Sequence, residues 1–475
     1  MLTAIKSRRT GVTWAGAAAL LLAAAVTLGA GGQAAARPAE GFSRRTRSHF
    51  DHAAVIKGPF ATPQDVTKAC LGCHDDAVAV MKTSHWQWLG AEVKVAGHAA
   101  PVRMGKKNLI NNFCIATIGN EQSCMKCHAG YGWKDASFDF TRAENVDCLV
   151  CHEQGSGYVK GPAGMPEKGV DLVAAARSVA TPSRENCLTC HAYGGGGQAV
   201  KHGDIDSSLV HPPAGEDVHM GKHGFLCVDC HAAPDHQLRG RAFSVGVEDG
   251  NGVACEACHK GRTHADARIE SHLRSVACQT CHVPTYARLI PTKASWDWSK
   301  AGDAGRQDDP HHYLKIKGEF VYEQDAIPEY RWFDLTVDRY LAGDKIDPEK
   351  VTELNPPRAG IGDAKARIWP FKVHRAVQPY DKVNRILLTP TTGGTGGYWT
   401  TFDWDSAFRL GAAASKLPYS GQYGWARTEM VWPLTHLVTP KEKALACDAC
   451  HGDHGRLDWR ALGYAGDPMQ TGGRP

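Results

Sequence analysis

The chain has 475 residues and a formal net charge of +4, with 22% of its residues charged and 43% hydrophobic. So small a net charge gives no indication of a nucleic-acid partner, and none is expected. Beyond residue 36, no segment approaches 18 consecutive apolar residues, which excludes a membrane-spanning helix there.

Residues 1–36 have the pattern of a secretory signal peptide. A positive region with Lys6 and two arginines precedes an Ala/Leu-rich run over 14–28, and small residues at 34–36 offer a cleavage site. The alternative is an anchor that is retained in the membrane, although the run is somewhat short for a span. The mature protein is expected to have no stable membrane span.

The pentapeptide Cys-x-x-Cys-His then occurs eight times. The thiol pairs are Cys70 and Cys73, Cys124 and Cys127, Cys148 and Cys151, Cys187 and Cys190, Cys227 and Cys230, Cys255 and Cys258, Cys278 and Cys281, and Cys447 and Cys450. The histidines that follow are His74, His128, His152, His191, His231, His259, His282 and His451. Two thiols at this spacing reach both vinyl groups of one porphyrin, and the histidine is placed as an axial iron ligand. The motif therefore predicts eight covalently attached haem c groups.

Zinc ribbons and disulfides are the competing interpretations of cysteine pairs. With 24 histidines in 475 residues, a given next residue is histidine about one time in 20 by chance, yet all eight pairs have one. A disulfide framework also fails, because 16 of the 17 cysteines lie in the motifs.

The motifs divide the chain unevenly. Residues 37–65 form a polar, loosely packed arm, and 66–290 carry seven motifs as a haem-dense core. Residues 291–446 lack cysteine but contain many aromatic residues, so we expect a folded region that packs on the core. The eighth motif and a tail occupy 447–475. We expect a mainly α fold with extensive coil, in which the haems form much of the interior.

Haem attachment also bears on the route of export. Haem c is attached after an unfolded chain has crossed the membrane, whereas the twin-arginine route that Arg8 and Arg9 would allow carries folded cargo. We therefore predict Sec-type export to the periplasm.

Sixteen histidines lie outside the motifs, enough to give each iron a second histidine. His236 follows His231 by five residues, and His264 follows His259 by five. A histidine so near its own motif cannot easily reach the opposite face of the same haem. Each is therefore expected to bind a neighbouring haem, bringing two irons into electron-transfer range.

Several longer runs carry a resemblance: KTSHW at 82–86, NNFC at 111–114, YGWKD at 131–135, KHGD at 201–204, IWPFKVH at 368–374 and WPLTH at 432–436. Together they resemble the octahaem tetrathionate reductase family of periplasmic cytochromes, over nearly the whole mature chain. The resemblance implies seven haems with two histidine ligands each and one active-site haem, attached to Cys124 and Cys127, with Lys201 as an axial ligand. The face of the iron that Lys201 takes stays open. The distal ligands implied are His85, His219, His236, His264, His272, His374 and His436.

Cys114 is the one cysteine outside the motifs, so it has no disulfide partner within the chain. It is either a buried structural thiol or a reactive sulfur at the active site. Beside lysines and ferric iron, a reactive thiol would have a lowered pKa.

The family resemblance implies reduction of tetrathionate to two thiosulfates. A site for this dianion needs positive charge, for which Lys201, Lys293 and Lys134 are candidates. Either the Cys114 thiolate or the haem iron would engage one sulfur of the central bond. Electrons would come from a small periplasmic cytochrome or a quinol-linked membrane cytochrome.

Two alternatives remain. One is reduction of nitrite or hydroxylamine, or hydroxylamine oxidation, although the chain has no Cys-x-x-Cys-Lys motif and nothing around Tyr464 supports a tyrosine cross-link. The other is an electron-transfer cytochrome without catalysis, which predicts eight six-coordinate low-spin haems.

Overall fold

The computed structural model of the chain describes residues 50–240 and 252–474. The predicted signal peptide and the first part of the polar arm lie outside the described residues. Within the described ranges, no helix is both long and apolar enough to cross a membrane.

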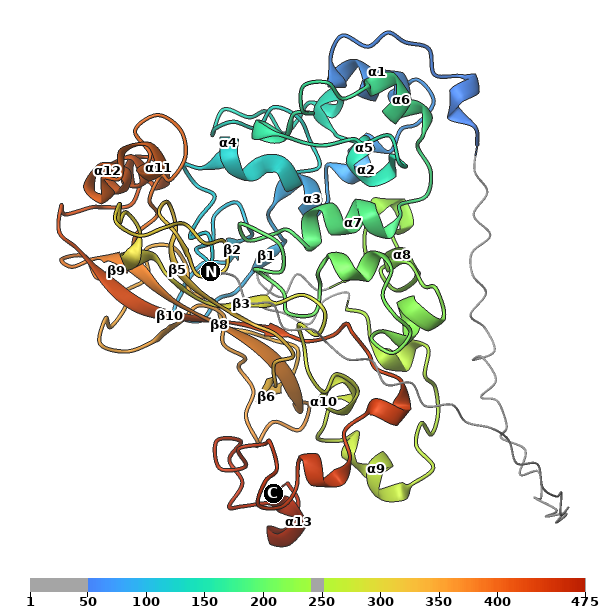
Figure 1. The fold of residues 1–475 in the computed structure, drawn as a ribbon, viewed down its shortest axis with the longest axis vertical. Helices are drawn as coiled ribbons and strands as arrows, with labels where there is room; N and C mark the ends of the chain where they lie inside the picture. The colour runs from blue at the N-terminus through green and yellow to red at the C-terminus, as the bar shows by residue number, and fades with distance from the viewer. Residues whose placement is uncertain (1–49, 241–251, 475) are drawn as a thin grey trace, which may run out of the picture. The chain divides into compact units, whose positions relative to one another are not determined.

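The helices are short and separated by long loops (Figure 1). The α-helices are α1 (Pro63–Leu71), α2 (Ala77–Val80), α3 (Ser84–Gln87), α4 (Glu121–Cys124), α5 (Leu149–His152), α6 (Leu172–Arg177), α7 (Arg184–His191), α8 (Cys227–Cys230), α9 (Ala267–His272), α10 (Cys278–His282), α11 (Tyr398–Thr401), α12 (Trp404–Ser415) and α13 (Pro468–Thr471). Single 3₁₀ turns include η1 (His52–Ala54), η2 (Met125–Cys127), η4 (Pro162–Gly164), η7 (Pro234–His236), η8 (Cys255–Ala257) and η11 (Cys447–Ala449). Helices this short gain little stability alone, so tertiary contacts must hold them.

The motifs need only one helical turn each. In five of them the histidine N–H donates to the carbonyl of the first cysteine, at 2.8–3.1 Å, in the motifs that begin at Cys70, Cys148, Cys227, Cys255 and Cys447. Two more motifs lie within α7 and α10. Residues three and four apart lie on one face of such a turn, so both thiols and the histidine can reach the same porphyrin.

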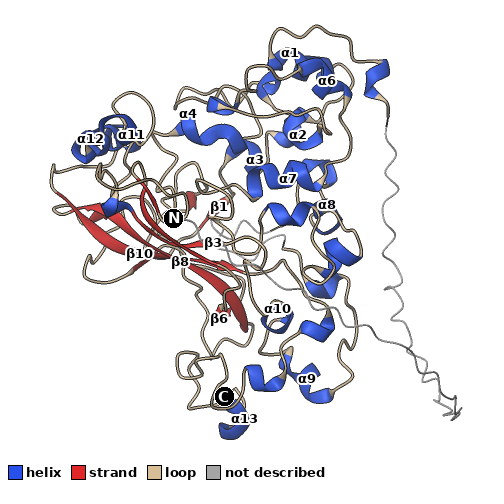
Figure 2. Cartoon of the chain, viewed as in Figure 1, coloured by secondary structure: helices blue, strands red, loops and turns tan. Residues whose placement is uncertain are grey.

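The cysteine-free region folds mainly as a mixed sheet, which the expectation of a mainly α fold missed (Figure 2). Its strands are β3 (Thr292–Asp297), β4 (Tyr313–Leu314), β5 (Gly318–Glu323), β6 (Glu329–Phe333), β7 (Thr352–Glu353), β8 (Arg367–Asp381), β9 (Ile386–Leu387) and β10 (Tyr423–Pro433). The order is β4-β5-β3-β8-β10-β7, and β6 and β9 also pair with β8. A separate ribbon joins β1 (Glu92–Val93) and β2 (Val102–Arg103).

Strand β8 is the centre of this sheet. It pairs antiparallel with β10, with His374 opposite Met430, and parallel with β3, with Trp296 opposite Ala376. Most of its side chains are buried, without the alternation typical of a half-exposed strand. Such continuous burial is typical of a central strand covered on both faces.

The tryptophans of this region build the main core. Trp296 stacks on Trp298 with ring centres 4.5 Å apart, and Tyr398 stacks on Trp404 at 3.6 Å. Both groups belong to a cluster that also contains Phe113, from the haem-dense segment. Part of this core is therefore shared between the aromatic region and the segment before the 124–128 motif.

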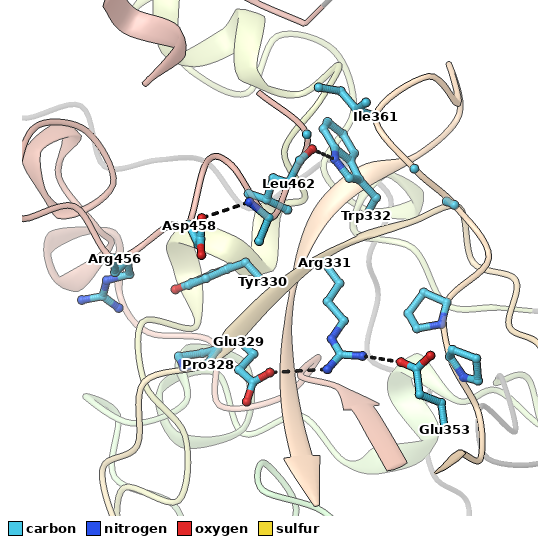
Figure 3. Close-up of a pocket in the computed structure, with 16 residues that line it drawn as sticks. Pro328, Glu329, Tyr330, Arg331, Trp332, Glu353, Ile361, Arg456, Asp458 and Leu462 are labelled. Carbon is cyan, nitrogen blue, oxygen red and sulfur yellow. Dashed lines mark hydrogen bonds and ion pairs between the residues drawn. The ribbon is translucent and has the colours of Figure 1, made fainter. Parts of the chain in front are cut away.

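The C-terminal segment is anchored to β6 and to the residue before β8, and Figure 3 shows its bond to Trp332 of β6. The indole of Trp332 donates to the carbonyl of Leu462 at 2.7 Å, and Arg474 donates to the carbonyl of Ala366 at 2.9 Å. A cavity of about 700 Å³ lies between β6 and this segment, lined by Tyr330 and Arg456 among others. These bonds fix the tail that follows the eighth motif.

Candidate functional site

Seven of the eight motif histidines face a second imidazole. The pairs, with the distance between ring centres, are His74–His52 at 6.3 Å, His152–His236 at 6.2 Å, His191–His85 at 6.2 Å, His231–His436 at 6.2 Å, His259–His219 at 6.2 Å, His282–His264 at 6.4 Å and His451–His272 at 6.2 Å. His236 and His264 each lie opposite a histidine of another motif, not of the motif that precedes them in the sequence.

This constant separation fits an iron between the rings. Two imidazoles on one metal have centres about 6.2 Å apart, because each nitrogen lies about 2.0 Å from the metal and about 1.1 Å from its ring centre. Many of these rings also bond outward through Nδ1, which leaves Nε2 for the metal. The acceptors are Ala180 O for His152 (2.9 Å), Arg239 O for His231 (2.8 Å), Arg268 O for His272 (2.8 Å), Asp204 for His436 (3.2 Å) and Asp467 for His451 (2.6 Å). The described residues therefore fit seven bis-histidine haems, although ligation itself stays a prediction.

The structure corrects one of the expected distal ligands. His374 lies in β8, where its Nδ1 is 3.1 Å from Asn112 Oδ1 and its ring is next to Phe113, with no motif histidine beside it. His52, which lies opposite His74, takes its place among the seven. His52 was not a candidate ligand in the sequence, because it lies in the arm that was expected to be loosely packed.

The eight motifs lie near one another in a single connected array. Thiol pairs from different motifs lie within hydrogen-bonding range: Cys70 and Cys148, Cys127 and Cys190, Cys187 and Cys227, and Cys255 and Cys278. Cys151 also lies within electrostatic range of Cys187, Cys230 within that range of Cys258, and Cys281 within that range of Cys447. All eight motifs are thus connected, and the 124–128 motif joins this array through the 187–191 motif.

The 124–128 motif differs from the others in its backbone. The N–H of His128 donates to Met125 O at 3.0 Å instead of to the first cysteine, and His128 has an extended conformation (φ −75°, ψ 136°). The helical turn therefore ends before the histidine, and the ring leaves the position that the other motif histidines take.

The ring of His128 is enclosed by aromatic side chains instead of facing an imidazole. Its Nε2 lies 2.7 Å from Trp86 O, and burial lowers the pKa of His128 to about 3, so a neutral ring donates from this nitrogen. The surrounding rings, with distances between centres, are Trp133 (4.8 Å), Trp86 (5.1 Å), Phe138 (5.5 Å), Trp88 (5.8 Å) and Phe140 (6.2 Å). An Nε2 that carries a proton cannot bind iron, so the expectation of His128 as an axial ligand does not fit this geometry.

Cys114 is held beside this motif by a tight turn. Asn111 Oδ1 accepts the N–H groups of Phe113 at 3.1 Å and Cys114 at 2.9 Å, and Ile115 has a φ of 63°. A β-branched residue rarely adopts this conformation, so the surrounding structure must impose it. The turn is tied to β8, because Asn112 donates to His374 O at 2.6 Å.

Four lysines gather around the Cys114 thiol, and we call Lys106, Lys201, Lys293 and Lys317 the cationic cluster. Charges on Lys106, Lys317 and Lys201 interact with Cys114, and Lys293 interacts with both Lys317 and Cys114. All four members lie over aromatic rings. The distances from Nζ to the ring centre are 3.3 Å for Lys293 and Phe320, 4.4 Å for Lys106 and Trp88, 5.0 Å for Lys201 and Trp432, and 6.0 Å for Lys317 and Trp296. Lys106 and Lys317 had no signal in the sequence.

The electrostatics of this cluster differ in part from the expectation. Burial raises the pKa of Cys114 and outweighs the nearby lysines, so the lowered pKa predicted beside lysines and ferric iron stays a prediction. Burial, and next the charge of Lys106, lower the pKa of Lys201 to about 8. Lys201 lies within electrostatic range of Cys127, and Cys114 lies within that range of Cys124, so both residues are in the neighbourhood of this motif. Lys134, in contrast, is exposed and does not belong to the cluster.

Comparison with known proteins identifies the family. The chain is similar to the crystal structure of octahaem cytochrome c from Shewanella oneidensis, with 47% sequence identity and a TM-score of 0.84 over 89% of this chain and 98% of that chain. This chain belongs to the octahaem c-type cytochromes. Family models also match, described as bacterial cytochrome c (residues 293–454), cytochrome c7 and related cytochrome c (214–283), and cytochrome c554 and c-prime (69–153).

A curated protein from Archaeoglobus fulgidus, named as uncharacterized, is 27% identical over 287 residues, which is 50% of this chain and 93% of that protein. The comparisons confirm a multihaem c-type cytochrome with covalently bound haem and a redox function. Within this cytochrome, one motif is distinguished by a displaced histidine, a free thiol and a cationic cluster.

Proposed function

We propose that this protein is a periplasmic octahaem cytochrome that reduces tetrathionate to thiosulfate at the haem attached to Cys124 and Cys127. The observation that carries the proposal is a coincidence of three features at one motif. His128 is turned away, Lys201 lies next to Cys127, and Cys114 is close to Cys124. No other motif in the described residues has a histidine without an imidazole opposite it.

Lys201 is proposed to take the axial position that His128 leaves. An amine binds iron only when it is neutral, and burial lowers the pKa of Lys201 to about 8, which makes the neutral form accessible near neutral pH. The haem, when bound, would supply electrons one at a time to the substrate. The other seven, each between two histidines, would pass electrons to it through the motif at 187–191.

The cationic cluster and Cys114 are proposed to bind and open the substrate. Tetrathionate carries two negative charges, which Lys106, Lys317 and the charged form of Lys293 would balance, since Lys201 is neutral when it binds iron. The Cys114 sulfur attacks one sulfur of the central S–S bond, releasing one thiosulfate and its own proton to solvent and forming a Cys114–thiosulfate disulfide. Two electrons from the haem array then cleave that new bond, giving the second thiosulfate and the Cys114 thiolate, which regains a proton.

A set of variants tests this assignment. Cys114→Ala should lower tetrathionate turnover by at least about 100-fold while the ferric haem spectrum stays unchanged, since a lost nucleophile removes the covalent step. Lys201→Met should change the spectrum of one haem and abolish turnover. Lys134→Met is the matched control, because that lysine is exposed, and should behave as wild type.

The same preparations should be assayed with nitrite and hydroxylamine. Turnover of these substrates that survives Cys114→Ala, with no tetrathionate reduction by the wild type, would overturn the proposed substrate. Eight low-spin bis-histidine signals in the wild type would instead show a protein that only transfers electrons.

A further inference from the structure

Four consecutive backbone carbonyls around Lys201 converge on two buried side chains. The Thr292 hydroxyl lies 2.6 Å from Ala199 O and 3.0 Å from His202 O, and shares its proton between them. Lys372 Nζ donates to Val200 O at 2.8 Å and to Lys201 O at 3.4 Å. Lys372 also donates to the Thr292 hydroxyl at 2.5 Å, so the two side chains form one unit.

Lys372 has surroundings that are unusual for a lysine. Its side chain is completely buried in β8, and burial lowers its pKa to about 7. Within the described ranges it makes no ion pair with a carboxylate; its three polar contacts are the two carbonyls and the Thr292 hydroxyl. A buried amine is strongly unfavourable without such partners, so its presence here indicates a specific role in holding these carbonyls.

The segment that carries Lys201 needs external support. It follows the glycine run 194–197, in which Gly195 and Gly196 have φ values of 87° and 98°, and Ala199 has a φ of 53°. Glycine-rich backbone has many alternative conformations, so this sequence alone does not fix the direction of the Lys201 side chain. Directly after it, Gly203 lies against Lys372, whose Cδ would be 3.1 Å from an added Cβ.

We propose that Lys372 and Thr292 form a clamp that positions the Lys201 amine for axial ligation. The inference rests on the proposed role of Lys201 and adds two positioning residues that do not touch the haem themselves. The peptide groups on both sides of the Lys201 Cα accept from Lys372, so the clamp fixes the direction in which that side chain leaves the backbone. Holding a ligand in its bound direction before binding raises its effective concentration at the metal.

The test is the electron paramagnetic resonance spectrum of the ferric holoprotein in two substitution series. Thr292→Val keeps the shape of the side chain and removes the hydroxyl, whereas Thr292→Ser keeps the hydroxyl. Thr292→Val should lower the signal of the lysine-ligated haem at least about threefold relative to the bis-histidine signals, and Thr292→Ser should restore it. Lys372→Met, of similar length, should give the same loss.

Thr439→Val is the matched control, because the Thr439 hydroxyl bonds to a motif-histidine carbonyl, His282 O, at 3.2 Å. It should leave the lysine signal unchanged. A lysine signal that persists in both Thr292→Val and Lys372→Met, yet disappears in Lys201→Met, would overturn the clamp and leave the proposed function intact. A wild-type signal that Lys201→Met does not change would instead overturn the ligand assignment itself.

Discussion

The buried pair of Lys160 and Asp147 offers a quantitative test of how the 124–128 motif is held. Lys160 Nζ lies 2.7 Å from Asp147 Oδ2, with side-chain exposures of 3% and 0%, and it donates to the carbonyls of His128 and Gly130. Asp147 also accepts from the hydroxyl groups of Tyr131 at 2.8 Å and Tyr158 at 3.0 Å. This pair was not predicted from the sequence.

Replacing Lys160 with methionine would leave the Asp147 carboxylate buried with neutral donors alone. Breaking a buried ion pair by removing one partner costs about 3–5 kcal/mol, because the remaining charge is left without compensation. Two carbonyls, of His128 and Gly130, also lose a donor. We therefore expect Lys160→Met to lower the free energy of unfolding by about 4 kcal/mol. Asp147→Asn in the same background should recover about 2 kcal/mol, since it removes the unpaired charge.

The free energies would be measured by guanidinium denaturation of the holoprotein, followed by far-ultraviolet circular dichroism. Lys126→Met is the matched control: Lys126 belongs to the same motif, but its ion pair with Glu167, at 3.6 Å, is about half exposed. That variant should stay within about 0.5 kcal/mol of the wild type. The reasoning is refuted if Lys160→Met costs less than about 1 kcal/mol, or if the two substitutions at Lys160 and Asp147 are additive.

Two further predictions concern single residues. His52→Ala should convert one of the eight haems from low-spin to high-spin in the ferric spectrum. His374→Ala should leave the number of low-spin haems unchanged. The opposite result would restore His374 as the distal ligand. Burial lowers the pKa of Lys293 to about 6, so its charged fraction rises from about one-tenth at pH 7 to about nine-tenths at pH 5. If the charged form binds the dianion, the Michaelis constant for tetrathionate should fall by up to about tenfold over that range, and Lys293→Met should remove this dependence.

The haem motifs could be predicted because all their chemistry is local. A motif such as 278–282 needs one helical turn, and the residues that define that turn are the ligands themselves. Distal ligands depend instead on contacts between distant segments, such as His272 with His451. His374 was assigned from its family context, but its strand is buried in the centre of the sheet, where its Nδ1 faces Asn112.

Only two of the four lysines in the cationic cluster were predicted from the sequence, because the cluster also depends on contacts between distant segments. Lys201 was named from its family context and Lys293 as a candidate positive charge. Lys317, in contrast, lies in a turn of the aromatic region and reaches the site because its Nζ donates to Gly196 O at 3.1 Å. Lys134 was a candidate because its motif resembled the family, yet it is exposed to solvent. The sequence shows which residues are charged, but contacts between distant segments decide which of them lie at the site.

The sheet explains why this cytochrome carries a long segment without cysteine. Strand β8 holds both segments that meet at the 124–128 motif. The Cys114 segment is held because Asn112 donates to His374 O. The Lys201 segment is held because Lys372 donates to the carbonyls on both sides of the Lys201 Cα. These two anchors are only two residues apart on the same strand. Short helices and loops around haems cannot hold two side chains from distant parts of the chain in register. A central strand with neighbours on both sides can, so the aromatic region is the platform on which the proposed active site is built.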